Sequence, residues 1–247
     1  MPEEEQQNAA LFHADADDVF GRIASRYDLM CDVFSLGSHR GWKHGLALRM
    51  SEENGQVVVD LAAGTGHIIH RLARRLARSP SAEKKQLRAI DLSPAMLAVA
   101  QRKGDLEGLK IRYEVMNAYE LTGVADASVD ILSIAFGMKI MNRSKVMTEV
   151  ARVLKTGGVF FCLEAARIPV PFLHRLYLGY MGICMPIMAR IVMGGDPSAY
   201  DYLLRGINGF PDQNHLAREF ESYGFRDVTF QNMSLGIVAL HRAVRHR

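Results

Sequence analysis

The sequence is poor in cysteine, and the cysteines it has form no recognisable pattern. Cys31, Cys162 and Cys184 are odd in number, and none belongs to a C-x-x-C pair. A disulfide framework needs an even set of cysteines, and a structural zinc site needs closely spaced pairs. We therefore expect no disulfide framework and no metal. Such low cysteine use is typical of the reducing cytoplasm.

The sequence also lacks an excess of charge of one sign. The chain of 247 residues carries 30 Lys and Arg against 27 Asp and Glu, which gives a net charge of +3. Its basic clusters are local, at residues 71–78 and in the tail 241–247. Because nucleic-acid-binding proteins usually carry a strong basic stripe, we expect no nucleic-acid partner.

A hydrophobic run long enough to cross a membrane is missing as well. The most apolar uncharged run, residues 176–189, contains Pro186 and falls short of the roughly 20 residues that a spanning helix needs. Residues 1–5 are acidic and polar, unlike a signal peptide. These features predict a cytoplasmic location.

The sequence does contain a strand pattern that ends in an acid and a glycine turn, at residues 57–67 (VVVDLAAGTGH). The valines before Asp60 are β-branched without alternation, as in a strand buried on both faces. Gly64 and Gly66 permit positive φ and let a ligand approach the backbone. The stretch predicts a nucleotide-type site, and the alternative is a tight turn that binds nothing.

Strand and helix patterns alternate along most of the chain. Further strands are predicted at residues 87–91, 111–116, 129–135 and 158–163, with a final pair at 228–232 and 236–241. Helices are predicted at 67–78, from Ser93, at 144–154 and at 212–223. Such alternation predicts an α/β fold with a doubly wound, mostly parallel seven-stranded sheet and right-handed crossovers.

Polar side chains end four of the predicted strands, namely Asp60, Asp91, Asn117 and Glu164. Parallel strands place these ends on one edge of the sheet, where open α/β folds bind ligands. Four such residues on one edge predict a site. Asn117 taken alone is equally typical of a turn.

The spacing of these residues predicts the ligand. Asp91 follows Asp60 by 31 residues, one βαβ unit, which suits an acid that binds ribose hydroxyls. Ala62 replaces the first glycine of the dinucleotide motif, which indicates an adenosine ligand without pyrophosphate. S-adenosylmethionine fits, with its amino-acid part at the glycine turn, its ribose at Asp91 and its adenine at Asn117 and Ala118. The predicted cofactor residues are Asp60, Ala62, Gly64, Thr65, Gly66, Asp91, Leu92, Asn117 and Ala118.

An N-terminal segment lies outside this alternation. Residues 17–27 have helical spacing, and residues 27–43 are rich in aromatic and polar side chains. They predict either a surface helix pair with Trp42 on the core, or a cap over the site. A cap would offer the side chains of Tyr27, His39 and Arg40.

A second segment, residues 165–195, is an apolar and Met-rich insertion, and another helix is predicted at 196–203. It predicts an adaptable wall around an apolar ligand, or else ordinary core or dimer contacts. We expect one domain over residues 1–247. Its predicted parts are a helical cap (1–50), a cofactor-binding core (51–164), a substrate-covering insertion (165–210) and a closing helix and strand pair (211–247).

Several stretches together resemble the ubiquinone/menaquinone biosynthesis C-methyltransferase family. The most specific are YDLMCDVFSLGSHRGWK at 27–43 and GIVALHR at 236–242, and others are DLAAGTG at 60–66, DLSPAML at 91–97, AFG at 135–137, VLKTGG at 153–158 and PDQ at 211–213. The resemblance spans residues 19–244. It implies a Rossmann-like class I methyltransferase that uses S-adenosylmethionine to methylate a ring carbon of a polyprenyl benzoquinol or naphthoquinol.

The resemblance also implies partners. The predicted cofactor residues would hold S-adenosylmethionine, and residues 165–200 would enclose a lipid quinol. Peripheral contact with the inner face of a membrane is expected through residues 168–195 or the basic tail. The sequence leaves open a homodimer or a quinone-synthesis complex.

Three positions depart from the family pattern. His67 stands where the family usually has Asp, Cys31 where it has Asn, and Lys139–Ile140 where it has an Arg–Asn pair beside the reacting ring. Two alternatives therefore stay open. One is a divergent paralogue that uses S-adenosylmethionine for another quinone modification, such as ring amination to rhodoquinone. The other is a cofactor-binding accessory protein of a quinone-synthesis complex.

The chemistry of ring methylation selects the catalytic candidates. A ring carbon becomes nucleophilic when a neighbouring hydroxyl loses its proton, so a base, or a cation beside the phenolate, is needed. We expect His39 to act as base or proton relay, Tyr27 and Arg40 as positioning groups, and Lys139 as the cation. This chemistry requires no metal.

Overall fold

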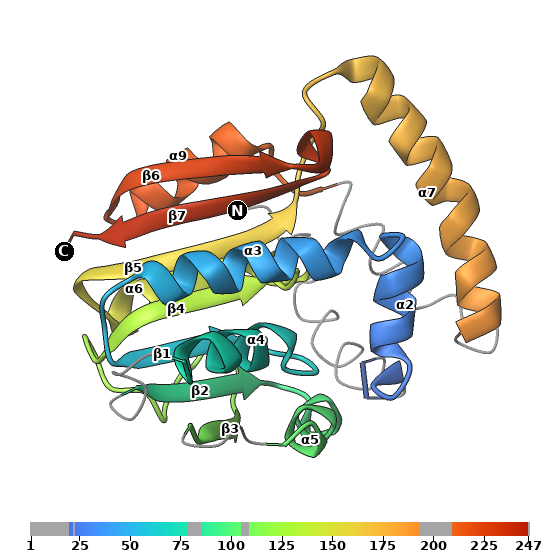
Figure 1. Ribbon diagram of the computed structural model, residues 1–247. Coiled ribbons are helices and arrows are strands. Elements are labelled where there is room, and N and C mark those ends of the chain that lie inside the picture. Colours follow the sequence, from blue (N-terminus) through green and yellow to red (C-terminus); the bar gives the residue numbers. More distant parts are fainter. Residues whose placement is uncertain (1–19, 22, 79–84, 105–108, 193–208, 247) are drawn as a thin grey trace.

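The computed structural model describes residues 20–21, 23–78, 85–104, 109–192 and 209–246. Within these ranges the strands are β1 (Val57–Leu61), β2 (Gln86–Asp91), β3 (Ile111–Val115), β4 (Val129–Ala135), β5 (Leu154–Ala165), β6 (Phe225–Met233) and β7 (Val238–Arg245). They form one sheet with the order β3-β2-β1-β4-β5-β7-β6 (Figure 1). The strands β1 to β5 run parallel, and β7 lies antiparallel between β5 and β6. The predicted mostly parallel, seven-stranded sheet is confirmed.

The described helices are α2 (Tyr27–Phe34), α3 (Ser38–Glu52), α4 (His67–Leu76), α5 (Pro94–Arg102), α6 (Arg143–Val153), α7 (Pro171–Val192) and α9 (Gln213–Ser222), with the 3-10 turns η2 (Met138–Ile140) and η3 (Ser234–Gly236). Three begin with a side-chain cap, and the cap of α6 is Asn142, which accepts a hydrogen bond from the N–H of Lys145. Ser93 Oγ accepts a hydrogen bond from the N–H of Met96 at the start of α5, and Asp212 caps α9 in the same way. Among the described helices, none combines the length and apolar character needed to cross a membrane.

The core lies on both faces of the sheet. In β1, β4 and β5, consecutive apolar residues alternate between two buried clusters, with Val59, Leu132 and Phe160 in one and Val58, Ile131 and Phe161 in the other. Helices α3 and α4 cover one face, and α6 and α9 cover the other (Figure 1). This burial on two sides is why the central strands read as continuous apolar runs.

Two details differ from the sequence expectations. The strand expected at 158–163 begins earlier, because α6 ends at Val153 and β5 already begins at Leu154. The pairing of β4 with β5 shifts register between Val129, which pairs with Leu154, and Ile131, which pairs with Val159. The additional residues of β5 between these two pairs form an irregularity in the strand. Of the helix expected at 17–27, residues 17–19 and 22 lie outside the described residues, residues 20, 21 and 23 are helical, and residues 24–26 form a turn before α2. The helix expected at 196–203 lies outside them altogether.

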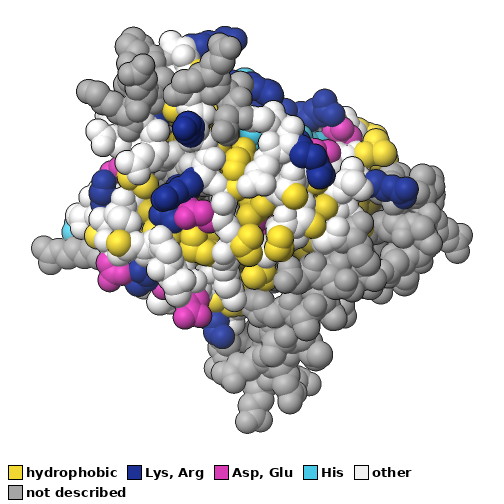
Figure 2. All heavy atoms as spheres, turned by 90° about the horizontal axis from the view of Figure 1, so that it is seen from below, with side chains coloured by type: hydrophobic (Ala, Val, Ile, Leu, Met, Phe, Trp, Pro, Cys, Tyr) yellow, Lys and Arg dark blue, Asp and Glu magenta, His cyan; other side chains and the backbone are white. Residues whose placement is uncertain are grey.

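The remaining helices stand at one edge of the sheet. Helices α2 and α7 lie beyond the C-terminal ends of the parallel strands and contact each other (Figure 1). Viewed from the β3 side, the surface mixes Lys and Arg with Asp and Glu around exposed hydrophobic side chains (Figure 2). The edge under α2 is where the polar strand ends meet, so the fold places the predicted cap over the predicted site.

The glycine turn after β1 generates a prediction about stability. Gly64 and Gly66 both have positive φ, 54° and 76°, but a Cβ on Gly66 would lie 2.9 Å from Ala100 Cβ and from His70, whereas a Cβ on Gly64 would meet nothing within 4 Å. Gly64→Ala should lower the free energy of unfolding by about 1–2 kcal/mol, the cost of the left-handed backbone. Gly66→Ala should cost roughly 1–3 kcal/mol more because of overpacking. Urea denaturation measures both, and equal losses would contradict the packing role of Gly66.

Candidate active site

The turn after β1 is shaped by the acid at the end of β2. The N–H of Gly64 donates a hydrogen bond to Asp91 Oδ2 over 2.7 Å, and the N–H of Ser93 donates to Oδ1 over 2.9 Å. Ala62, not a glycine, adopts a left-handed backbone with φ 56° at the start of the turn. Each carboxylate oxygen can accept more than one hydrogen bond, so Asp91 can hold the turn and still bind hydroxyl groups.

A first cavity opens beside this turn. Six predicted cofactor residues line it, namely Ala62, Gly64, Asp91, Leu92, Asn117 and Ala118. The other three lie behind the turn. Asp60 is buried and accepts a hydrogen bond from Ser133 Oγ over 2.7 Å, Thr65 binds α2, and Gly66 begins α4 against Ala100. Burial raises the pKa of Asp60 to about 7.

The lining of this cavity fits the predicted cofactor. Among the described residues that line it, Asp91 carries the negative charge and there is no Lys or Arg. A pyrophosphate would meet no positive side chain there, whereas a ribose and a positively charged sulfonium suit the acid. Met96, Met116 and Ala118 supply apolar walls for an adenine ring. No described residues form a metal-binding cluster.

A second cavity of about 400 Å³ adjoins the first. Tyr27 and Phe136 line both cavities and therefore form the boundary between them. The second cavity is mainly aromatic and apolar, with Met30, Phe34, Trp42, Tyr177, Tyr180 and Met181 on its walls. Three of these come from α7, so the insertion does contribute a wall, as one of the two sequence alternatives expected.

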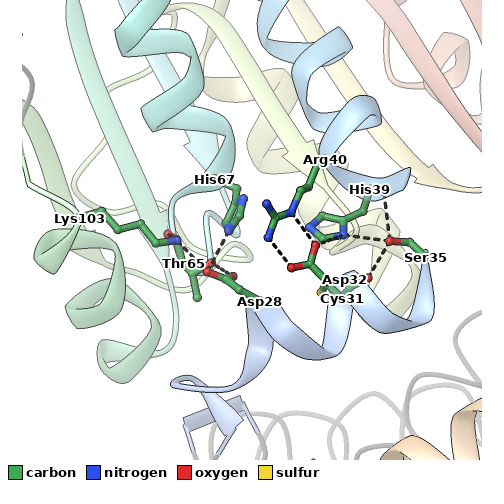
Figure 3. A network of polar contacts seen from close by, with 9 residues as sticks. All are labelled: Asp28, Cys31, Asp32, Ser35, His39, Arg40, Thr65, His67 and Lys103. Atoms are coloured by element: carbon green, nitrogen blue, oxygen red, sulfur yellow. Dashed lines mark hydrogen bonds and ion pairs between the residues drawn. The ribbon is translucent and has the colours of Figure 1, made fainter. Parts of the chain in front are cut away.

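A polar network ties the cap to the glycine turn (Figure 3). Asp28 on α2 accepts a hydrogen bond from Thr65 Oγ1 on Oδ1 at 2.6 Å and from Lys103 Nζ on Oδ2 at 3.0 Å, and His67 Nε2 lies 2.9 Å from Oδ2. Lys103 also donates to the carbonyl of Thr65. Although burial opposes it, these contacts hold the pKa of Asp28 well below its usual range. Asp28 thereby fixes the neighbouring Tyr27 between the two cavities.

His39 enters the second cavity as a neutral base. Its Nδ1 lies 3.0 Å from Ser35 Oγ, while that hydroxyl donates its one proton to the carbonyl of Cys31 over 2.7 Å. The ring must then donate from Nδ1, which leaves Nε2 as an unprotonated acceptor. Nε2 is buried without a hydrogen-bond partner among the described residues. Burial, assisted by the charge of Lys43, lowers the pKa of His39 to about 4.

The structure separates the other catalytic candidates. Tyr27 lines both cavities, and the adjacent Cys31 together with burial raises its pKa, so it stays a protonated phenol. Arg40 is exposed, forms a bidentate pair with Asp32, and lines neither cavity. Lys139 lines the second cavity, but its ammonium group is bound by Glu164 at 3.0 Å and by the carbonyl of Phe136.

Sequence reasoning missed two residues that matter in this arrangement. Lys43 lines the second cavity and is buried, four residues after His39 on the same face of α3. Phe136 divides the cavities with a left-handed backbone, φ 60°, at the end of β4. The i, i+4 spacing of His39 and Lys43 is visible in the sequence and was the available signal.

The proximity of Lys43 to His39 predicts that removing the lysine changes the pKa of the histidine. Lys43→Met removes a nearby positive charge, so the pKa of His39 should rise from about 4 toward the ordinary 6.5. Because the folded pKa lies below the ordinary one, the stability that His39 contributes is present above pH 6.5 and is lost as the pH falls toward 4. NMR titration, with His39→Ala to assign the signal, measures the shift. Lys43→Arg is the control, and an unchanged pKa in Lys43→Met would contradict the coupling.

The sequence matches known proteins over nearly its whole length. A family model described as the ubiE/COQ5 methyltransferase family matches residues 7–245. A Brucella abortus (strain S19) protein named ubiquinone/menaquinone biosynthesis C-methyltransferase UbiE is 34% identical over 91% of this chain and 83% of the relative. An Oryza sativa subsp. japonica protein named 2-methoxy-6-polyprenyl-1,4-benzoquinol methylase, mitochondrial, is 32% identical over 92% of this chain and 82% of the relative.

Solved structures share the fold at lower identity. A Thermotoga maritima structure described as a SAM-dependent methyltransferase, possible histamine N-methyltransferase, aligns with a TM-score of 0.58 and 16% identity over 93% of this chain and 99% of its own. The CurJ carbon methyltransferase aligns with a TM-score of 0.62 and 13% identity over 98% of this chain and 71% of its own. These likenesses show the fold alone. The family model and the curated relatives show more: the chain belongs to the ubiE/COQ5 methyltransferase family.

Proposed function

We propose that this chain transfers a methyl group from S-adenosylmethionine to a ring carbon of a polyprenyl benzoquinol or naphthoquinol. The observation that carries the proposal is the pair of adjoining cavities that share Tyr27 and Phe136. One has the lining expected for the cofactor, and the other is aromatic, apolar and equipped with a neutral base. The names of its relatives support the same reaction.

As a member of this methyltransferase family, the chain uses S-adenosylmethionine, which supplies an electrophilic methyl group on a sulfonium. The protein mainly has to position the reactants, because displacement at a methyl group requires an in-line approach. Asp91 would bind the ribose, the backbone at Gly64 the amino-acid part, and Asn117 and Ala118 the adenine. Phe136 and Tyr27 would set the line along which the ring carbon faces the first cavity.

The chain's own residues would activate the ring. His39 Nε2 can accept the proton of a quinol hydroxyl, because it is unprotonated and lines the second cavity. Loss of this proton makes the ring carbon next to the hydroxyl nucleophilic. Tyr27 remains protonated and can donate a hydrogen bond to an oxygen of the substrate.

A membrane surface would deliver so apolar a substrate. Helix α7 contributes Tyr177 and Met181 to the second cavity while it exposes Phe172, Leu176 and Ile183 to solvent. Exposed large apolar side chains of this kind suit peripheral insertion into the interfacial layer of a bilayer. The polyprenyl tail would then leave the cavity along α7.

One observation favours the alternative of a different quinone modification. Lys139 replaces the family's usual Arg, and its ammonium group is neutralised by the buried carboxylate of Glu164. A paired lysine offers neither a free charge nor the bidentate fork of arginine. This second candidate keeps the cofactor and the quinone and changes the group transferred to the ring.

The test is incubation of the purified protein with methyl-labelled S-adenosylmethionine and short-tail demethyl benzoquinols and naphthoquinols, with products identified by mass. We expect one methyl group on the ring of one head-group class. Cofactor binding without any methylated product would overturn the proposal. Quinones of altered nitrogen content from a strain that expresses the protein would then support the alternative.

The network around Asp28 generates a further prediction. Asp28→Asn removes the charge that holds α2 against the glycine turn, and charge-assisted hydrogen bonds contribute about 1.5–3 kcal/mol each. Because α2 supplies Tyr27 to the cofactor cavity, we expect affinity for S-adenosylhomocysteine to fall about tenfold or more. Isothermal titration calorimetry measures it. Glu219→Gln, which breaks the ion pair with Arg143, is the matched control, and equal effects of the two substitutions would contradict the role of Asp28.

A further inference from the structure

Lys43 is a buried cation without a partner in the part of the chain that the structure describes. Its side chain lies on the same face of α3 as His39, lines the second cavity and is 8% exposed. No residue that the structure describes forms a hydrogen bond or ion pair with its Nζ, although all but a small part of the side chain is enclosed. A buried ammonium group normally requires a compensating charge or hydrogen bonds.

No hydrogen bond or ion pair joins Lys43 to the described acids near it. The charged and titratable groups that face it are Cys31, Asp28, Lys103, Asp60, His39 and His67. Asp28 is held by Thr65, Lys103 and His67. Asp60 Oδ1 accepts a hydrogen bond from Ser133, its Oδ2 has no hydrogen-bond partner among the described residues, and burial raises its pKa to about 7. Burial also raises the pKa of the Cys31 thiol, which keeps it uncharged.

Lys139 provides the contrast within the same cavity. Its ammonium group contacts Glu164 and the carbonyl of Phe136, so its charge is compensated inside the protein. Of the two lysines among the described residues that line the second cavity, only Lys43 has a charge that no ion pair compensates. Because burial disfavours an ammonium group that no ion pair compensates, it lowers the pKa of Lys43. A bound anion would restore the preference of Lys43 for the charged form.

We propose that Lys43 is a catalytic residue that binds the ionised oxygen of the substrate, so that the second cavity selects phenols that bind as phenolates. This inference rests on the proposed function and names the cation that the reaction needs. The hydroxyl O–H bond breaks, its electron pair stays on oxygen opposite Lys43, and the proton moves to His39 Nε2. Lys43 thus takes the role that the sequence suggested for Lys139.

A nitrophenol with a short alkyl chain tests this directly, because only its phenolate form absorbs visible light. The purified protein is titrated with this probe at a fixed pH without cofactor. We expect the wild-type protein to bind the phenolate and Lys43→Met to bind it about tenfold more weakly, a difference of about 1.4 kcal/mol. Lys43→Arg, which keeps the charge, should recover most of the binding.

Lys155→Met is the matched control, since it removes the same charge from an exposed lysine paired with Asp130. It should leave phenolate binding unchanged. Equal binding by wild type and Lys43→Met would overturn the inference, and so would a wild-type protein that binds the neutral phenol or no probe at all.

Stability separates this role from a structural one. A ligand-binding lysine without a partner costs the empty protein stability, so Lys43→Met should raise the melting temperature, whereas loss of a structural lysine would lower it. In the methyl-transfer assay, Lys43→Met should lose activity at neutral pH and regain part of it as rising pH ionises the quinol. A lowered melting temperature together with a pH profile of unchanged shape would overturn the inference.

The two proposals fail in different ways. Phenolate binding that depends on Lys43, in a protein that methylates no quinol, would leave this inference standing and overturn the proposed function. Methyl transfer to a quinol by wild type and by Lys43→Met at equal rates would do the reverse.

Discussion

The contact between Asp28 and the glycine turn decides the shape of the active site. Both cavities have walls from α2, which supplies Tyr27 to both and Met30, Cys31 and Phe34 to the second. The helix lies beyond the sheet edge, away from the central core, and Asp28 fixes it to Thr65 and Lys103. A single carboxylate thus couples the position of the cap to the turn that shapes the cofactor cavity.

Charged side chains are distributed unevenly between the two cavities. Among the described lining residues, the first cavity has one acidic side chain and no Lys, Arg or His, whereas the second cavity has two lysines and a histidine. One lysine is neutralised by Glu164, and the histidine is uncharged because burial and Lys43 lower its pKa to about 4. The second cavity therefore combines an unprotonated nitrogen with a positive charge that no described residue compensates, and this charge can stabilise an anionic oxygen of a ligand.

The sequence predicted the sheet well because its signals are local. Apolar runs marked β1 and β4, and the cap at Ser93 marked α5, with bounds close to those observed. The site was predicted only in part, because contacts across the chain cannot be read from spacing. The spacing does not show that Asp60 is buried with one oxygen bonded to Ser133, nor that the fold places Glu164 beside the ammonium group of Lys139. The untested roles of these residues stay predictions.

The departures from the family pattern are connected in space, although they are far apart in the sequence. His67 lies 2.9 Å from Asp28, and the Asp that the resemblance implies at this position would place two carboxylates close together. Cys31 lies on the same helix as Asp28, and the charges of Lys43 and Lys139 both act on its thiol. Residues that share partners in this way do not contribute independently. The three departures are best understood as one altered group beneath the cap, in which a change at one position alters the charge that the others experience.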